Sequence, residues 1–129
     1  VYVPVRKSTD LGMRPAMSRA KVARVLDTLR SKPHRLPKDY RVRQESVSEK
    51  IGAGRPIVTA EAVRDLTWHK ARAHLTKKDS ELLQRGQEFL AAEMALISDG
   101  EVSEANERIE SILTVAMASW EQQRSVQTA

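Results

Sequence analysis

Two segments with helical apolar spacing, close together near the end of the chain, constrain its fold most strongly. The first runs from Thr76 to about Ser98 and the second from Ser103 to about Arg124, with the breaker Asp99-Gly100 between them. Their apolar residues recur on one side of a helix of 3.6 residues per turn. These residues are Leu83, Leu90, Met94 and Ile97 in the first segment, and Ile109, Ile112, Leu113, Ala116 and Trp120 in the second. Two long helices joined by so short a connection are expected to form an antiparallel hairpin.

Three shorter helices are expected before the hairpin. Ser18 can cap a helix that runs to about Ser31, a second helix spans about Gln44 to Ile51, and Thr59 can cap a third that ends near Leu75. Aromatic residues make up 4% of the chain, so Ala, Leu, Ile, Val and Met must fill the interior, and these suit close packing of helices. The sequence therefore predicts an all-α fold: an extended basic N-terminal arm with one helix, then a small helical bundle that ends in the long hairpin.

Two of these helices carry capping signals at their starts. Thr76 and Asp79 have the spacing of a capping box, in which the side chain of each residue bonds to the backbone N–H of the other. Val58, which precedes Thr59, can pack against Val63 as a hydrophobic staple. Both signals predict that a helix begins directly after a threonine.

Positive charge is concentrated in the first 43 residues. They hold twelve of the 22 lysines and arginines of the chain but three of its 17 acidic residues, so the remainder is mildly acidic. Such asymmetry indicates a polyanionic partner for one end of the chain and a different role for the other. The sequence therefore predicts a basic nucleic-acid-binding arm, residues 1–43, and a helical core and assembly domain, residues 44–129.

The basic residues of the arm are the candidate binding site. Cations spaced every few residues along a segment follow a phosphate backbone and read its charge rather than its sequence. The chain has few aromatic side chains on which single strands could stack, which agrees with binding to the phosphate backbone, and both DNA and RNA stay possible. An acidic protein surface is the alternative. The candidate nucleic-acid-binding residues are Arg6, Lys7, Arg14, Arg19, Lys21, Arg24, Arg30, Lys32, Arg35, Lys38, Arg41 and Arg43.

The sequence offers no pattern for catalysis or metal binding. It has no cysteine, and His69 and His74 lie five residues apart, so on a helix they point away from each other and cannot share a metal ion. No nucleophile lies at a spacing that a neighbouring base could activate. The longest apolar run, Phe89 to Ile97, is too short to span a bilayer, and no signal-peptide pattern follows Arg6 and Lys7. We therefore expect a non-enzymatic protein with no cofactor, no metal and no membrane span.

The turn from Gly52 to Pro56, which lies between two expected helices, suggests an alternative function. This arrangement looks like the helix-turn-helix of bacterial repressors, although a second helix that opens with Glu61 and Asp65 would bring carboxylates toward phosphates and base edges. The glycines do not fit the Gly-x-x-x-x-Gly-Lys-Ser/Thr pattern of a phosphate loop, which favours a tight interhelix turn over a nucleotide site. A helix-turn-helix DNA-binding regulator therefore stays as an alternative.

Two stretches carry a resemblance to a known family. The basic helix from Ser18 to Arg24 and the break from Lys50 to Gly54, in a chain that joins a basic arm to a helical hairpin, resemble the coat proteins of rod-shaped and filamentous viruses of archaea. The resemblance implies a structural protein of the virion, a nucleocapsid-like coat whose basic arms enclose double-stranded DNA. Other coat subunits, of one kind or two, would be its partners. A peripheral subunit of a large ribonucleoprotein or other multiprotein assembly inside the cell is a further alternative.

Overall fold

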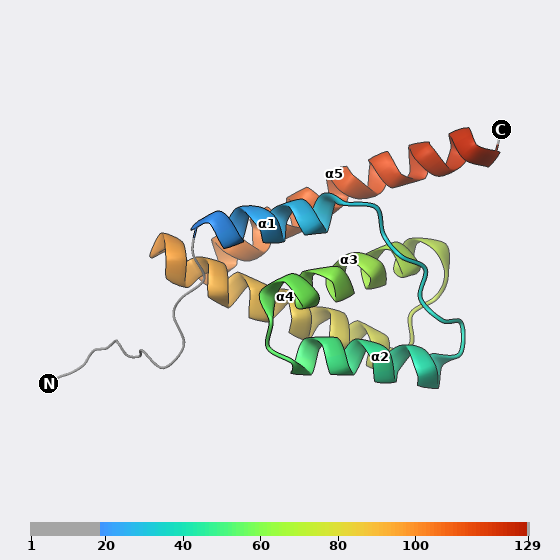
Figure 1. Cartoon of the computed structure of the whole chain (residues 1–129), viewed down its shortest axis with the longest axis horizontal. Coiled ribbons are helices and arrows are strands. Elements are labelled where there is room, and N and C mark those ends of the chain that lie inside the picture. The colour runs from blue at the N-terminus through green and yellow to red at the C-terminus, as the bar shows by residue number, and fades with distance from the viewer. Residues whose placement is uncertain (1–18, 129) are drawn as a thin grey trace, which may run out of the picture.

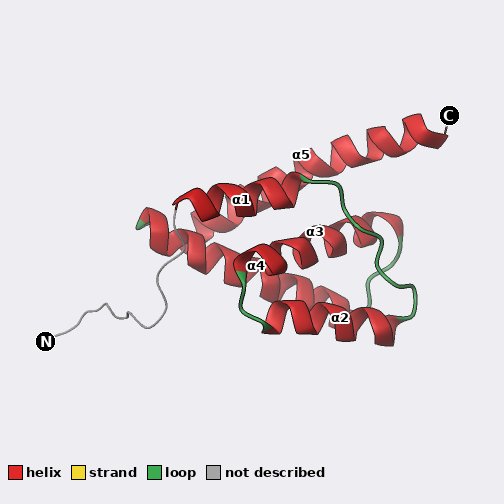
Figure 2. Cartoon of the chain, viewed as in Figure 1, coloured by secondary structure: helices red, strands yellow, loops and turns green. Residues whose placement is uncertain are grey.

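Five α-helices make up the fold (Figures 1 and 2). The computed structural model describes residues 19–128 of the chain. In chain order the helices are α1 (Arg19–Arg30), α2 (Tyr40–Gly52), α3 (Pro56–Arg72), α4 (Lys77–Ser98) and α5 (Val102–Thr128). Within these residues there is no β-strand. The predicted all-α fold is confirmed, and so is the hairpin of α4 and α5 at its end.

The central helix of the bundle is α3, because it contacts each of the other four helices. Figure 1 shows it between α1 on one side and α2 on the other. Ala60, Val63 and Leu66 of α3 have no exposed surface at all. Burying a valine or leucine side chain stabilises a fold by about 1.5 to 3 kcal/mol. This burial holds the shorter helices around α3.

The hairpin of α4 and α5 closes the other side of the core. Leu90 of α4 and Ile109 of α5 are fully buried there. α4 ends at Asp99, which adopts a left-handed conformation with φ of 54°, and Gly100 follows it. The left-handed residue terminates the helix and reverses the chain, as the Asp99-Gly100 breaker predicts.

The capping box at the start of α4 is confirmed, but two other helices begin earlier than the sequence predicts. Thr76 caps α4 together with Asp79, with both reciprocal bonds present. α3 begins at Pro56 and not after Thr59, because proline in the first turn has the helical φ already fixed and needs no N–H partner. α2 begins at Tyr40, since the side chain of Asp39 caps it by accepting a bond from the N–H of Arg41 at 2.9 Å.

The predicted boundary between arm and core at residue 43 stays a prediction. In the structure, Val25, Leu26 and Leu29 of α1 are buried in the same apolar cluster as the residues of α3, α4 and α5. The indole N–H of Trp120 in α5 also donates to the carbonyl oxygen of Arg30 at 3.3 Å. The described part of the basic segment is therefore packed onto the bundle.

Gly86 of α4 sets how closely α3 and α4 approach. A Cβ atom at this position would lie 2.8 Å from Cγ2 of Val63 and 3.5 Å from Cδ1 of Ile51. Valine in a helix has one strongly preferred side-chain rotamer, so Val63 cannot easily turn away. We expect Gly86→Ala to lower the free energy of unfolding by about 1 to 3 kcal/mol, measured by urea denaturation, because the two helices must move apart.

The matched control is Gly86→Ala combined with Val63→Ala. The second substitution removes the clashing methyl group, so the double variant should be more stable than the sum of the two single effects predicts. At an open helical site, alanine is more favourable than glycine by about 1 kcal/mol. A Gly86→Ala variant with increased stability would contradict the close approach of α3 and α4.

Candidate nucleic-acid interface

The connector between α1 and α2, residues 31–39, is held against the bundle by two buried ion pairs. The first is on α3, where Nε of Arg64 lies 2.9 Å from Oδ1 of Asp65. The same Asp65 oxygen accepts a hydrogen bond of 2.8 Å from the backbone N–H of His34, and Nη1 of Arg64 donates to Oγ of Ser31 at 2.8 Å. This pair therefore fixes the first half of the connector.

The second ion pair joins α2 to α4. Arg43 donates from Nη2 and Nε to the two carboxylate oxygens of Asp79, at 2.6 and 3.1 Å. Nη1 of Arg43 donates to the carbonyl oxygens of Pro37 and Lys38, at 3.2 and 3.0 Å. Bidentate, charge-assisted bonds of this kind fix orientation as well as distance. They hold the second half of the connector, in which Leu36 is buried.

Asp79 also caps α4, which concentrates several donors on one carboxylate. The backbone N–H and the hydroxyl of Thr76 both lie 3.0 Å from Oδ2 of Asp79. Burial by itself would raise the pKa of Asp79, but the hydrogen bonds from Arg43 and Thr76 outweigh it and lower the pKa from 3.8 to about 2. The carboxylate is therefore charged in the folded state at neutral pH and ties α2, the connector and α4 together.

The first turn of α2 presents an exposed aromatic side chain beside a cation. Tyr40 is 55% exposed, and Cζ of Arg41 lies 5.8 Å from the centre of its ring. Nη2 of Arg41 is 3.5 Å from Oδ2 of the capping residue Asp39. The N–H and the side chain of Arg41 both hydrogen-bond to Asp39 and lower the pKa of that carboxyl group. Arg43, two residues beyond Arg41, is buried and bound to Asp79, and these bonds fix the position of the turn.

The start of α4 lies next to this turn and adds two more cations. Nε2 of Gln44 in α2 donates to Oγ1 of Thr76 at 2.9 Å, which brings the two helix starts together. Lys77 and Lys78 directly follow Thr76 and are exposed. We call the surface formed by Lys38, Tyr40, Arg41, Lys77 and Lys78 the basic face.

The predicted binding residues of the connector and α2 differ in how exposed their side chains are. Lys32, Arg35, Lys38 and Arg41 are exposed and can reach a polyanion. Arg43 is 3% exposed, and its guanidinium is engaged by Asp79 and two carbonyl groups. The expectation that Arg43 contacts phosphate must therefore be corrected: it positions the basic face from within the core.

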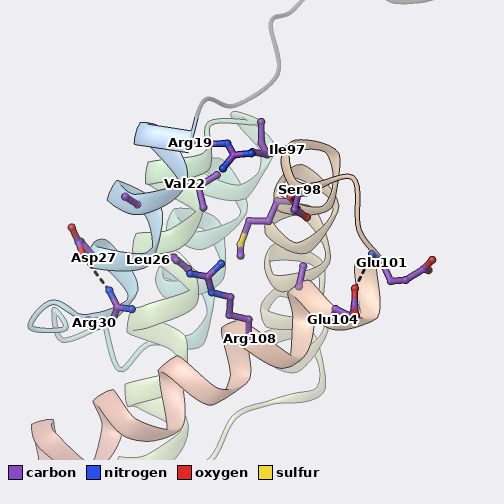
Figure 3. Close-up of a pocket in the computed structure, with 13 residues that line it drawn as sticks. Arg19, Val22, Leu26, Asp27, Arg30, Ile97, Ser98, Glu101, Glu104 and Arg108 are labelled. Carbon is purple, nitrogen blue, oxygen red and sulfur yellow. Dashed lines mark hydrogen bonds and ion pairs between the residues drawn. The ribbon is translucent and has the colours of Figure 1, made fainter.

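The predicted residues of α1 lie elsewhere. Arg19 and Arg30 line a cavity of about 630 Å³ between α1, the C-terminal end of α4 and the start of α5 (Figure 3). In Figure 3 the side chains of Arg19 and Arg108 both extend over this cavity, while Arg30 is paired with Asp27 at 3.1 Å. α4 has 22 residues and is thus about 33 Å long, so its two ends place this cavity far from the basic face.

Five candidate nucleic-acid-binding residues remain, two on α1 and three before it. Lys21 of α1 is half-buried and Arg24 is exposed. Arg6, Lys7 and Arg14 lie outside the residues that the structure describes. For these positions, and for the exposed bases of the connector, phosphate contact stays a prediction.

Sequence reasoning missed Tyr40, Lys77 and Lys78. The sequence places Tyr40 in the extended basic arm, because it predicts that the second helix starts at Gln44. The signal that could have found it is Asp39, a preferred capping residue, directly before it. The two lysines fell in the part of the chain that was classed as acidic, although they directly follow the predicted capping residue Thr76.

The part of the chain that the structure describes contains neither a cluster of metal ligands nor a helix that could span a membrane. In residues 19–128, no three or more His, Cys, Asp or Glu side chains come together as metal ligands. Over the same range, every helix is too short or too polar to cross a bilayer.

The fold is a small helical module that exposes cations and an aromatic ring at the starts of α2 and α4. Residues 24–110 match the family model of the CarD C-terminal domain, which is two thirds of the chain. The chain therefore belongs to the CarD C-terminal domain family, a family of bacterial transcription regulators. Domains of this kind interact with nucleic acid and protein in transcription.

Family membership corrects the resemblance to archaeal viral coat proteins. That resemblance depended on a basic helix, a glycine-containing break and a helical hairpin, and these features occur in unrelated helical proteins. The expectations of a virion coat function, of coat subunits as partners and of a virion location are wrong, because the matched family regulates bacterial transcription. The alternative of a DNA-binding regulator is better supported.

The buried pair of Arg43 and Asp79 predicts a specific loss of stability in acid. The folded-state pKa of Asp79 is about 2, below its ordinary value of 3.8, so its contribution is fully present above about pH 5 and is lost as the pH falls through 4 toward 2. We expect about 2 kcal/mol of the free energy of unfolding to disappear over this window, measured by urea denaturation at a series of pH values.

The control for this prediction is the double variant Arg43→Met and Asp79→Leu, which removes both charges together. Replacing a buried ion pair by apolar side chains is often tolerated, whereas removing one partner costs about 3 to 5 kcal/mol. The double variant should lose less stability than the wild-type protein between pH 5 and pH 2. An equal loss in the two proteins would show that Asp79 is not the group that titrates.

Proposed function

We propose that this chain is a DNA-contacting module of a bacterial transcription regulator, and that it acts by binding rather than by catalysis. Membership of the CarD C-terminal domain family supports a role in transcription. The observation that carries the proposal further is Tyr40, an exposed ring at the start of α2 with the guanidinium carbon of Arg41 5.8 Å from its centre.

The basic face has the composition of a surface that grips and deforms duplex DNA. Lys38, Arg41, Lys77 and Lys78 can neutralise phosphates on either side of the aromatic ring. Proteins that kink DNA often insert an apolar wedge at a flexible base step while flanking cations hold the backbone. Tyr40 is suited to this role because the bonds of Asp39 and Arg43 hold its turn in place, so little ordering is needed on binding.

A helix-turn-helix mode of binding does not fit the arrangement of α2 and α3. The recognition helix of that motif must enter the major groove with its first turns exposed. In α3, however, the first ten residues are mostly buried, because the other helices surround this helix. The buried residues include Pro56, Thr59, Ala60, Val63 and Asp65. We therefore assign the contact to the start of α2 and not to α3.

Substitution of Tyr40 tests the proposal. Aromatic contact with a base is worth about 1 to 3 kcal/mol, so Tyr40→Ala should weaken duplex binding by roughly tenfold, whereas Tyr40→Phe should retain most of the affinity. The measurement is fluorescence anisotropy of a labelled duplex that contains a flexible TA step. The full 129-residue chain is used.

The matched control is Val115→Ala on α5. Val115 is 70% exposed, so this variant also removes an exposed apolar side chain, but from a helix that contributes nothing to the basic face. It should bind DNA as the wild-type protein does. Equal affinities of Tyr40→Ala and Val115→Ala would remove the wedge from the account, and absence of duplex binding by the wild-type chain would overturn the proposed function.

A further inference from the structure

A second cationic surface, a notch, shares no residue with the basic face. It is a cavity of about 340 Å³ between the connector, the second half of α3 and the second half of α5. We call it the tryptophan notch and define it by Lys32, Arg35, Trp68, Arg72, Trp120 and Arg124. Its volume is at the lower end of the range of about 300 to 1,000 Å³ that is typical of small-ligand sites.

The floor and wall of the notch are rigid. Trp120 is 5% exposed and anchored by its hydrogen bond to the carbonyl oxygen of Arg30. Trp68 is half-buried and packs edge to face against Trp120, with 5.9 Å between ring centres and an angle of 84° between the rings. The two rings hold this part of the surface in one shape, so a ligand would meet a preformed site.

The rim of the notch carries positive charge. Cζ of Arg72 lies 5.5 Å from the centre of the Trp68 ring, so the guanidinium is held over the aromatic face. Lys32 and Arg35 are exposed on the connector. The residues that line the notch include no carboxylate. Glu121, which is 3.2 Å from Nη1 of Arg124, offsets part of the charge of that arginine alone.

We propose that the tryptophan notch binds a phosphate-bearing ligand. Lys32, Arg35 and Arg72 line one cavity in which no carboxylate is a lining residue, which favours a compact, multiply charged anion. Arginine guanidinium groups match phosphate oxygens through paired hydrogen bonds. The phosphate can come from a free nucleotide or from a nucleic-acid backbone. The assignment does not depend on the Tyr40 contact, because the ligand is recognised by a separate set of residues.

The two tryptophans of the chain both line this notch, so intrinsic fluorescence reports on it directly. The probe is pyrophosphate, titrated into the full chain against sodium chloride of the same ionic strength. We expect a saturable change in tryptophan emission with pyrophosphate and a much smaller one with malonate, a dianion that lacks phosphate. Absence of a saturable change, or an equal response to malonate, would overturn the proposal.

Variants separate binding in the notch from general attraction to a basic protein. Arg35→Gln and Lys32→Gln each remove one rim cation from an exposed position and should weaken pyrophosphate binding by roughly tenfold, the scale of a hydrogen bond to a charged group. Arg85→Gln, an exposed arginine of α4 outside the notch, should bind as the wild-type chain does. Equal affinities of all three variants would show that no site exists.

Competition identifies the source of the phosphate. Displacement of pyrophosphate by a short DNA duplex, lost in Arg35→Gln but kept in Tyr40→Ala, would assign the notch to the DNA backbone. Tighter binding of a nucleoside triphosphate than of pyrophosphate, without displacement by the duplex, would assign it to a free nucleotide. Since Tyr40→Ala tests the basic face and Arg35→Gln tests the notch, failure of one proposal is distinguishable from failure of the other.

Discussion

The carboxylates of Asp65 and Asp79 are the groups on which the functional surface depends. Each is buried, each is paired with an arginine, and each pair also bonds to the connector. A connector of nine residues with one buried leucine cannot be ordered by apolar burial alone, because fixing each residue costs about 1 to 2 kcal/mol of backbone entropy. The ion pairs supply the missing constraint. As a result, Arg35, Lys38 and Tyr40 are presented from fixed positions.

The helices were predictable because each carries its own signal. The apolar spacing in α4 and α5, the capping box of Thr76 and Asp79 and the breaker at Asp99 all act within a few residues of the chain, so the sequence alone reveals them. The starts of α2 and α3 were misplaced because two signals competed at each of them. Asp39 can cap as well as any later residue, and Pro56 can open a helix although it also reads as part of a turn.

The site was less predictable because its parts come from distant segments. Counting charges placed Arg43 among the phosphate contacts, yet Asp79, 36 residues away, draws it into the core. The same count assigned Lys77 and Lys78 to the acidic remainder of the chain, although a bond from Gln44 to Thr76 joins the start of α4 to the first part of α2. Charge asymmetry indicates a polyanionic partner, and that indication stays a prediction for this chain. Only tertiary contacts distinguish a cation that faces the partner from one that supports the fold.

The most direct test of the account is to map where a short DNA duplex touches the chain, by following the backbone amide signals of the labelled protein in an NMR titration. We predict that the shifted signals cluster in residues 38–45 and at the start of α4, and that the signals of residues 102–116 in α5 stay in place. Shifts confined to the hairpin of α4 and α5, with an unaffected first turn of α2, would contradict it.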